Sequence, residues 1–266
     1  MTTTTTINDG TPAEARASIT TGLSDFDALA GPIPRGRITL GAAPPSSGAT
    51  ALALAVARHN NVIGRTVALV NFQTNQDQLM SNLLASTASV NVDRLETVNE
   101  GRRQRLERAA EIMQAGRMWS WCPDSRWAVG DLRERLAAIP GLDLLIVDDY
   151  GLASYDEPAE GATFTTLQEI ARSRNIPVLV TAHLAVPEGG DENAVPTLSG
   201  LHSLDQPAVA AETVLIVHRP DREGTVPSRR SEVDLIAVKG WANTGTVTVR
   251  FEPEYHRLVG GTDEMR

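Results

Sequence analysis

"GAAPPSSGAT", residues Gly41 to Thr50, is a loop of small residues between two segments of different pattern. The short apolar run "RITL" precedes it, and "ALALAVARHN", whose apolar residues have helical spacing, follows it. A strand, a loop of small residues and a helix in this order form a phosphate-binding loop, which ends in Gly-Lys-Ser or Gly-Lys-Thr. This loop ends in Gly48, Ala49 and Thr50. Its position therefore predicts phosphate binding, but its sequence lacks the lysine.

Strand and helix patterns alternate along the rest of the chain. Continuous apolar runs such as "TVALV" and "LLIV" are typical of strands that are buried on both faces. The alternation predicts an α/β fold with a mostly parallel twisted sheet flanked by helices. The last two strands have no helix pattern between them and should form an antiparallel hairpin. We expect strands over 38–41, 66–71, 144–148, 178–181, 213–218, 231–238 and 246–251, and helices over 50–60, 75–88, 101–115, 129–138 and 163–174.

Length and composition indicate a single large domain. The chain has 266 residues, which suits one α/β domain, and residues 1–18 are expected to be a disordered leader before a folded domain over 19–266. No apolar run is long enough for a membrane span, and the first residues lack the basic and apolar regions of a signal peptide. The single cysteine excludes an internal disulfide. We therefore expect a cytoplasmic protein.

The site should lie at the carboxyl ends of the strands, where parallel sheets bind ligands. Backbone amides of the loop would contact phosphate, and the Thr50 hydroxyl would hold Mg²⁺. The run "LLIV" ends in Asp148 and Asp149, and an aspartate at such a strand end is typical of a magnesium ligand. Only one of two adjacent side chains points toward the site on an extended chain. The candidate nucleotide-binding residues are Ser46, Ser47, Gly48, Ala49 and Thr50, and the candidate metal ligands are Thr50 and one of Asp148 and Asp149.

The order of these segments resembles the C-terminal RecA-like ATPase domain of the DnaB-type replicative helicases. The resemblance is carried by "TTGLSDFDALAGPIPRGRITLGAAPPSSGAT", "VALVNFQTNQDQL", "MWSWCPDSRWAVGDLRERL", "LDLLIVDDYGL", "IPVLVTAHL", "AAETVLIVHRPD" and "GTVTVRFEPEYHRL". It covers about residues 19 to 259. It implies a RecA-like P-loop NTPase fold and, in working members, ATP and Mg²⁺ as ligands.

The same resemblance implies that several catalytic positions are degenerate. The lysine of the phosphate loop falls on Ala49, and the glutamate that activates the attacking water falls on Gln73. The glutamine that senses the γ-phosphate falls on His183. Glutamine can orient a water but cannot accept its proton. Asp149 matches the metal-binding aspartate, and Asp148 replaces an apolar residue before it.

Two further positions concern charges near the phosphates. In the family, a lysine and an arginine near the last hairpin enter the neighbouring subunit's nucleotide site. Lys239, the only lysine of the chain, matches the first, whereas "KGWANTGTV" has no arginine. An arginine from outside the loop could replace the missing lysine, and Arg35, Arg37 and Arg65 are the alternatives.

The resemblance also predicts which loops would face single-stranded DNA, namely residues 151–165 and 184–200. The first contains Asp156, Glu157 and Glu160, the second contains Glu188, Asp191 and Glu192, and neither contains lysine or arginine. The chain as a whole carries a net charge of −9. Because phosphate backbones are bound through positive charge, binding of single-stranded DNA is not expected.

These features predict a pseudo-ATPase of a replication system that acts by binding proteins. ATP and Mg²⁺ should bind weakly or not at all. The expected partners are copies of the chain or a related helicase in a ring, or other replication proteins, and the expected role is helicase regulator, loader or mixed-ring subunit. Two alternatives remain: an active ATP-dependent helicase or recombinase-like ATPase with rearranged catalytic groups, and a RecA-fold scaffold unrelated to replication.

Overall fold

The computed structural model describes residues 18–91, 99–123, 129–150, 162–184, 194–196, 211–221 and 229–261. The first 17 residues lie outside these ranges, so the predicted leader is not described. The acidic residues expected to face DNA, in 151–165 and 184–200, also lie outside them.

A nine-stranded sheet forms the centre of the described part, in the order β3-β2-β4-β5-β1-β6-β7-β8-β9. Strands β1 to β6 pair in parallel, and β7 to β9 pair antiparallel. This confirms the predicted mostly parallel sheet with an antiparallel C-terminal hairpin. The strands are β1 Ile38–Ala43, β2 Thr66–Asn71, β3 Arg117–Trp121, β4 Leu144–Asp148, β5 Val178–His183, β6 Thr213–His218, β7 Glu232–Lys239, β8 Gly245–Glu252 and β9 Arg257–Val259.

The sequence patterns did not predict β3 and β9. Strand β3 lies at one end of the sheet beside β2, and its residues are only half-buried or exposed, so "RMWSW" lacks a continuous apolar run. Strand β9 lies at the other end and has only three residues. Strand β3 thus has no fully buried side chain, and β9 is too short to show a pattern.

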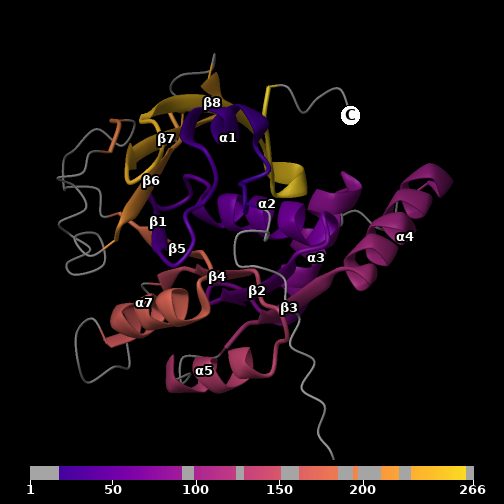
Figure 1. Ribbon diagram of the computed structural model, residues 1–266. Coiled ribbons are helices and arrows are strands. Elements are labelled where there is room, and N and C mark those ends of the chain that lie inside the picture. The colour runs from indigo at the N-terminus through magenta and orange to yellow at the C-terminus, as the bar shows by residue number, and fades with distance from the viewer. Residues whose placement is uncertain are drawn as a thin grey trace, which may run out of the picture.

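Helices cover both faces of the sheet, and Figure 1 shows α5 and α7 on the face opposite α2 and α3. The side chains of β4 alternate between the two resulting cores, with Leu144 and Ile146 in one and Leu145 and Val147 in the other. None of the described helices is long and apolar enough to cross a membrane. The helices are α1 Ser24–Ala30, α2 Ala49–Val62, α3 Gln76–Ala88, α4 Glu100–Ala115, α5 Val129–Ala137 and α7 Ala162–Arg174.

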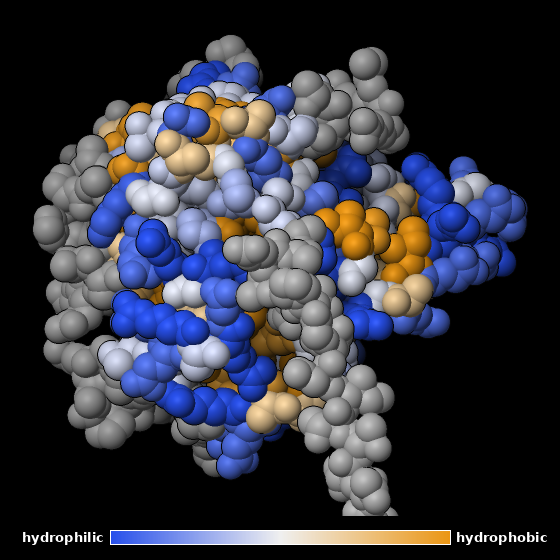
Figure 2. All heavy atoms as spheres, in the orientation of Figure 1, coloured by the Kyte–Doolittle hydropathy of each residue, from blue (hydrophilic) through white to orange (hydrophobic). Residues whose placement is uncertain are grey.

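Helix α4 projects from the body of the molecule (Figure 1). Of its residues, only Ala109 is buried, and Figure 2 shows hydrophilic residues over its outer end. Hydrophobic residues gather between α3 and α4 (Figure 2), where Met80, Leu84, Met113 and Met118 line a groove of about 300 Å³. This groove is separate from the phosphate-type loop, whose residues do not line it.

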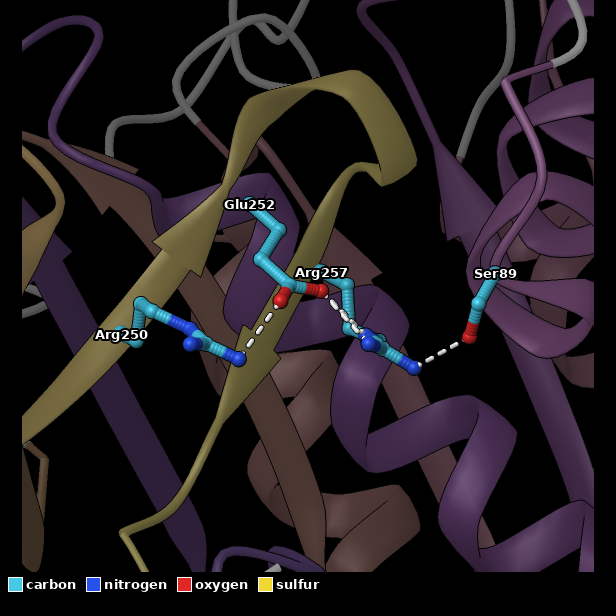
Figure 3. Close-up of polar contacts among 4 residues, drawn as sticks. All are labelled: Ser89, Arg250, Glu252 and Arg257. Atoms are coloured by element: carbon cyan, nitrogen blue, oxygen red, sulfur yellow. Dashed lines mark hydrogen bonds and ion pairs between the residues drawn. The ribbon is translucent and has the colours of Figure 1, made fainter. Parts of the chain in front are cut away.

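A chain of polar contacts attaches the C-terminal hairpin to the end of α3, as Figure 3 shows. Glu252 Oε1 accepts a hydrogen bond of 2.8 Å from Arg250, and Glu252 Oε2 accepts one of 2.9 Å from Arg257 Nε. Arg257 Nη1 donates to Ser89 Oγ at 2.6 Å. These contacts flank Phe251 and His256 in the sequence, and so they fix the part of the hairpin that reaches the phosphate-type loop.

Candidate functional site

The predicted site residues meet at the carboxyl ends of the parallel strands. Strand β1 lies between β5 and β6, and β4 lies between β2 and β5, so the chain leaves these strands at one edge of the sheet. A cavity of about 440 Å³ opens there. Its lining contains Pro44, Pro45, Ser46, Gly48, Ala49, Thr50, Ala51, Leu54, Gln73, His183, Arg219, Phe251 and His256.

The loop has the backbone of an anion-binding turn. Gly48 is in the left-handed region with φ of 106°, which only glycine adopts without strain, and Ser46 has φ of 60°. Helix α2 begins at Ala49 with no acidic residue in its first turn. Ser47 is buried, and its hydroxyl has no hydrogen-bond partner among the described residues. The free amides of a helix start favour an anion, and the backbone of Ser46 to Thr50 can therefore still hold a phosphate.

The side chain of Gln73 crosses the site beyond the loop. Its Oε1 accepts a hydrogen bond of 3.3 Å from Thr50 Oγ1. Its Nε2 donates to Asp149 Oδ2 at 2.8 Å and lies 3.1 Å from His183 Nε2. We call these three contacts the Gln73 bridge. It joins residues from four elements or their ends, all of which the resemblance assigned to the site.

Asp148 lies beneath this bridge and is fully buried. Its carboxylate accepts hydrogen bonds from Asn71 Nδ2 at 2.7 Å and from Thr181 Oγ1 at 2.6 Å. Burial raises the pKa of Asp148 to about 6, although hydrogen bonds from Thr181 and Thr50 favour its charged form. A buried carboxyl that shares donors with both neighbouring strands holds the ends of β2, β4 and β5 together.

Asp149 follows with φ of 60°, a left-handed conformation that is uncommon outside glycine. The chain is therefore no longer extended at this residue, so the alternation of side chains on which the expectation of a single site-facing aspartate rested does not reach Asp149. Asp149 contacts Gln73, whereas Asp148 is buried and bonded to Asn71 and Thr181. Alternation of side chains holds only within a strand, so the left-handed backbone, and not alternation, sets the direction of the Asp149 side chain.

The prediction that one of three arginines replaces the loop lysine is wrong. Arg35 and Arg37 precede β1, and Arg65 precedes β2, so they lie at the amino ends of strands. A strand of six residues spans about 18 Å, which separates them from the loop.

The cation that lines the cavity is Arg219, which follows β6. Its guanidinium lies 5.6 Å from the centre of the Phe251 ring, and its Nε has no hydrogen-bond partner among the residues that the structure describes. Phe251 and His256 also line the cavity. Sequence reasoning did not include these residues, although Arg219 directly follows a predicted strand, the position where ligand-binding residues were expected.

The turn that would carry charges into a neighbouring subunit is fixed to its own domain. Lys239 Nζ donates to the carbonyl of Ala211 at 2.8 Å. Trp241 Nε1 donates to the carbonyl of Val214 at 2.9 Å, and its ring meets Phe26 edge to face at 5.3 Å. Gly240 has φ of 78°, and a Cβ there would lie 2.1 Å from the backbone oxygen of the residue before β6, so the close contact requires glycine.

Side chains of the right chemistry to bind Mg²⁺ are present, but they already make hydrogen bonds to another residue. Mg²⁺ takes oxygen ligands in octahedral geometry, and the Thr50 hydroxyl and Asp149 carboxylate are suitable oxygens. Both are hydrogen-bonded to Gln73. The described ranges contain no group of three or more His, Cys, Asp or Glu side chains placed to hold a metal. In this conformation the residues do not fit the ion.

Comparison with known proteins confirms the resemblance over nearly the whole chain. The family described as "DnaB-like helicase C terminal domain" matches residues 18–259. The replicative DNA helicase DnaB of Geobacillus stearothermophilus is 24% identical over 91% of this chain, and that of Treponema pallidum (strain Nichols) is 27% identical over 91%. The match covers 56% of each of these helicases, so the chain spans about half their length.

Solved structures share the fold. A solved ATPase domain aligns with a TM-score of 0.80 at 20% identity, and the alignment covers 93% of each chain. A DnaB-like replicative helicase, studied with its interactions with primase, aligns with a TM-score of 0.79 at 20% identity, over 92% of this chain and 63% of that one. The sheet order, the loop and the matched residues lead to one conclusion: the chain belongs to the DnaB-like helicase C-terminal domain family.

Proposed function

We propose that this protein is a pseudo-ATPase of a DNA replication system, which acts by binding other proteins. The observation that carries the proposal is the phosphate-type loop itself, whose lysine position is the buried Ala49. Without an ammonium group, the loop offers backbone amides and the Thr50 hydroxyl to the phosphates. These groups support weak nucleotide binding, but they neutralise little of the charge on the β and γ phosphates.

The position of the general base supports the same proposal. Gln73 lies where the resemblance places a glutamate, and its amide cannot take a proton from an attacking water. His183 lies 3.1 Å from Gln73 Nε2, so it cannot both accept this hydrogen bond and take a proton at the same nitrogen. The loss of phosphate grip and the loss of the base are independent deficits, and both must be repaired before ATP turns over.

The partners that we propose are copies of this chain or a related helicase, in a ring or a loading complex. Family membership supports this, because the RecA-like domain is the part of the relatives that this chain matches. The acidic composition of residues 151–165 and 184–200 supports proteins over single-stranded DNA as partners. We further propose a cytoplasmic location and a folded unit over 19–266.

The proposal is tested by repairing the two deficits one after the other. We expect wild type to release no phosphate from ATP, Ala49→Lys to bind ATP more tightly without turnover, and Ala49→Lys/Gln73→Glu to gain some turnover. Binding is measured by fluorescence anisotropy of a labelled ATP analogue and turnover by phosphate release. Gln104→Lys, at an exposed position of α4, serves as the control for added charge. Wild-type turnover of about 1 s⁻¹, within the usual range for enzymes, would contradict the pseudo-ATPase role.

A second candidate function is an active ATPase with rearranged catalytic groups. The observation that favours it is Arg219, which places a cation in the cavity from outside the loop. If Arg219 replaced the loop lysine, Arg219→Ala would abolish turnover in wild type. The same phosphate-release assay therefore distinguishes the two candidates.

A further inference from the structure

We infer that the Gln73 bridge occupies the magnesium position and that release of this side chain controls metal-dependent nucleotide binding. The inference deepens the proposed function, and it rests on that proposal only in treating the cavity as a nucleotide site. The three groups joined by the bridge are the loop hydroxyl, the strand-end carboxylate and the imidazole at the end of β5. An ion coordinated by Thr50 and Asp149 would need the space that the carboxamide holds between them.

The hydrogen-bonding capacity of the carboxamide is almost fully used. An amide has two N–H donors, and here one meets Asp149 Oδ2 at 2.8 Å while the other meets His183 Nε2 at 3.1 Å. In the second contact His183 Nε2 is the acceptor. The amide oxygen accepts from Thr50 Oγ1 at 3.3 Å. The partly positive NH₂ group thus faces the carboxylate, as a cation would.

The backbone around Gln73 is held firmly, so only the side chain is free to move. Asn71 Oδ1 accepts hydrogen bonds from the backbone N–H groups of Gln73 at 3.0 Å and Thr74 at 2.9 Å. Asn71 Nδ2 donates in turn to the buried Asp148. The turn after β2 is therefore preorganised and aims the side chain of residue 73 at Asp149. Gln73 itself is exposed, so a rotamer change can clear the site without unfolding.

Because of the bridge, the glutamine at this position does more than fail to act as a general base. A residue that merely lacked a carboxylate would leave Thr50 and Asp149 available to the ion. Gln73 instead competes with it, because the carboxamide lies between Thr50 Oγ1 and Asp149 Oδ2, and Asp149 Oδ2 must give up the hydrogen bond from Gln73 Nε2 before it coordinates metal. Removal of the side chain should therefore increase metal affinity, whereas removal of an ordinary metal ligand would decrease it.

The direct test measures Mn²⁺ binding, with Mn²⁺ in place of Mg²⁺, by electron paramagnetic resonance in the presence of saturating ADP. We expect Gln73→Ala to bind Mn²⁺ about tenfold more tightly than wild type, since the carboxamide no longer lies between the two ligands and its hydrogen bond to Asp149 is lost. Gln73→Met, which keeps the length but has no N–H donor, should also tighten binding. Gln78→Ala is the matched control, because that exposed glutamine of α3 bonds Asn82, away from the cavity, and should leave Mn²⁺ affinity unchanged.

A second variant tests whether the tighter Mn²⁺ binding arises at Asp149. Gln73→Ala/Asp149→Asn should return Mn²⁺ affinity to the wild-type value or below, since the released carboxylate is then absent. Equal or weaker Mn²⁺ binding by Gln73→Ala, including no detectable binding by either protein, would overturn the inference. This failure is distinguishable from failure of the proposed function, which is decided by phosphate release from wild type and not by metal affinity.

Discussion

The family resemblance assigns a charged residue to the phosphate-type loop and to the β7–β8 turn, residues 240–244; neither region carries one, and they differ in what stands in its place. At the loop, Ala49 leaves an open cavity of about 440 Å³ whose groups are joined by one exposed side chain, Gln73. At the turn, Trp241 fills the place with an aromatic ring that packs on Phe26. The loop has kept the geometry of a binding site, whereas the turn has become part of the scaffold.

This difference follows from where each region lies in the sheet. The loop is surrounded by strand ends whose side chains face a cavity, so loss of the lysine leaves the backbone amides accessible. The turn lies against α1, where the backbone N–H of Ala242 donates to the carbonyl of Ala30 at 3.1 Å and Asn243 Nδ2 donates to that of Leu29 at 3.0 Å. A turn with this many contacts to its own domain is poorly suited to reach into a neighbour.

The largest effect is expected at the turn, from Trp241→Ala. The variant loses the edge-to-face contact with Phe26 and the hydrogen bond to Val214, and the free energy of unfolding should fall by about 3 kcal/mol. Trp241→Phe, which keeps a ring but loses the N–H donor, should lose only about 1 kcal/mol. Urea denaturation measures both. A loss below about 0.5 kcal/mol for Trp241→Ala, the size of an ordinary surface substitution, would mean that the turn is not part of the scaffold.

How far the sequence predicted these regions depends on the physical rule that was used. Apolar runs predicted seven of the nine strands, and the rule that ligands bind at carboxyl ends correctly brought Thr50, Gln73, Asp149 and His183 together. The same rule excludes Arg35, Arg37 and Arg65, which precede their strands and have only their charge in favour of phosphate binding.

Other parts of the site could not be predicted from local patterns. Phe251 and His256 reach the cavity because β8 and β9 lie beside the end of α3, a contact between distant segments made through Arg257 and Ser89. The Gln73 bridge depends on the left-handed backbone at Asp149, which no hydrophobic pattern reveals. Tertiary contacts and backbone conformation at strand ends, not the identity of the strands, limited the prediction.

The second-largest effect is expected at Asp148, which is buried beneath the loop site, and it is a dependence of the free energy of unfolding on pH. The pKa of Asp148 is raised by burial from 3.8 to about 6, so the folded protein binds this proton more tightly than the unfolded chain. Its stabilising contribution is therefore complete below pH 3.8 and is lost as the pH rises through 6. We expect the free energy of unfolding of wild type to fall by about 2 kcal/mol between pH 4 and 7.5 from this group alone.

Asp148→Asn isolates this contribution, because asparagine keeps a similar shape and does not titrate. The difference in unfolding free energy between wild type and Asp148→Asn should change across the same pH range, in favour of the variant as the pH rises. Urea denaturation at several pH values measures it. Asp143→Asn, a matched change before β4 where a carboxylate accepts the backbone N–H of Thr66, serves as the control. A difference that does not vary with pH would show that folding does not raise the pKa of Asp148.

The smallest effect is expected at Lys239. This residue gives the most direct test of the difference between the loop and the turn. Its side chain is exposed, and Nζ is bonded to the carbonyl of Ala211 in the same chain. Lys239→Ala should lower the free energy of unfolding by less than about 0.5 kcal/mol, as surface substitutions do. Because the turn is fixed to its own domain, the mass of any assembly should also stay unchanged, as measured by sedimentation or native mass spectrometry. If an assembly that wild type forms dissociates in the variant, then Lys239 Nζ contacts a neighbouring subunit instead of the Ala211 carbonyl. The turn would then take part in subunit contacts. A strictly monomeric wild type, alone and with a related helicase, would remove the ring itself as the setting for either region.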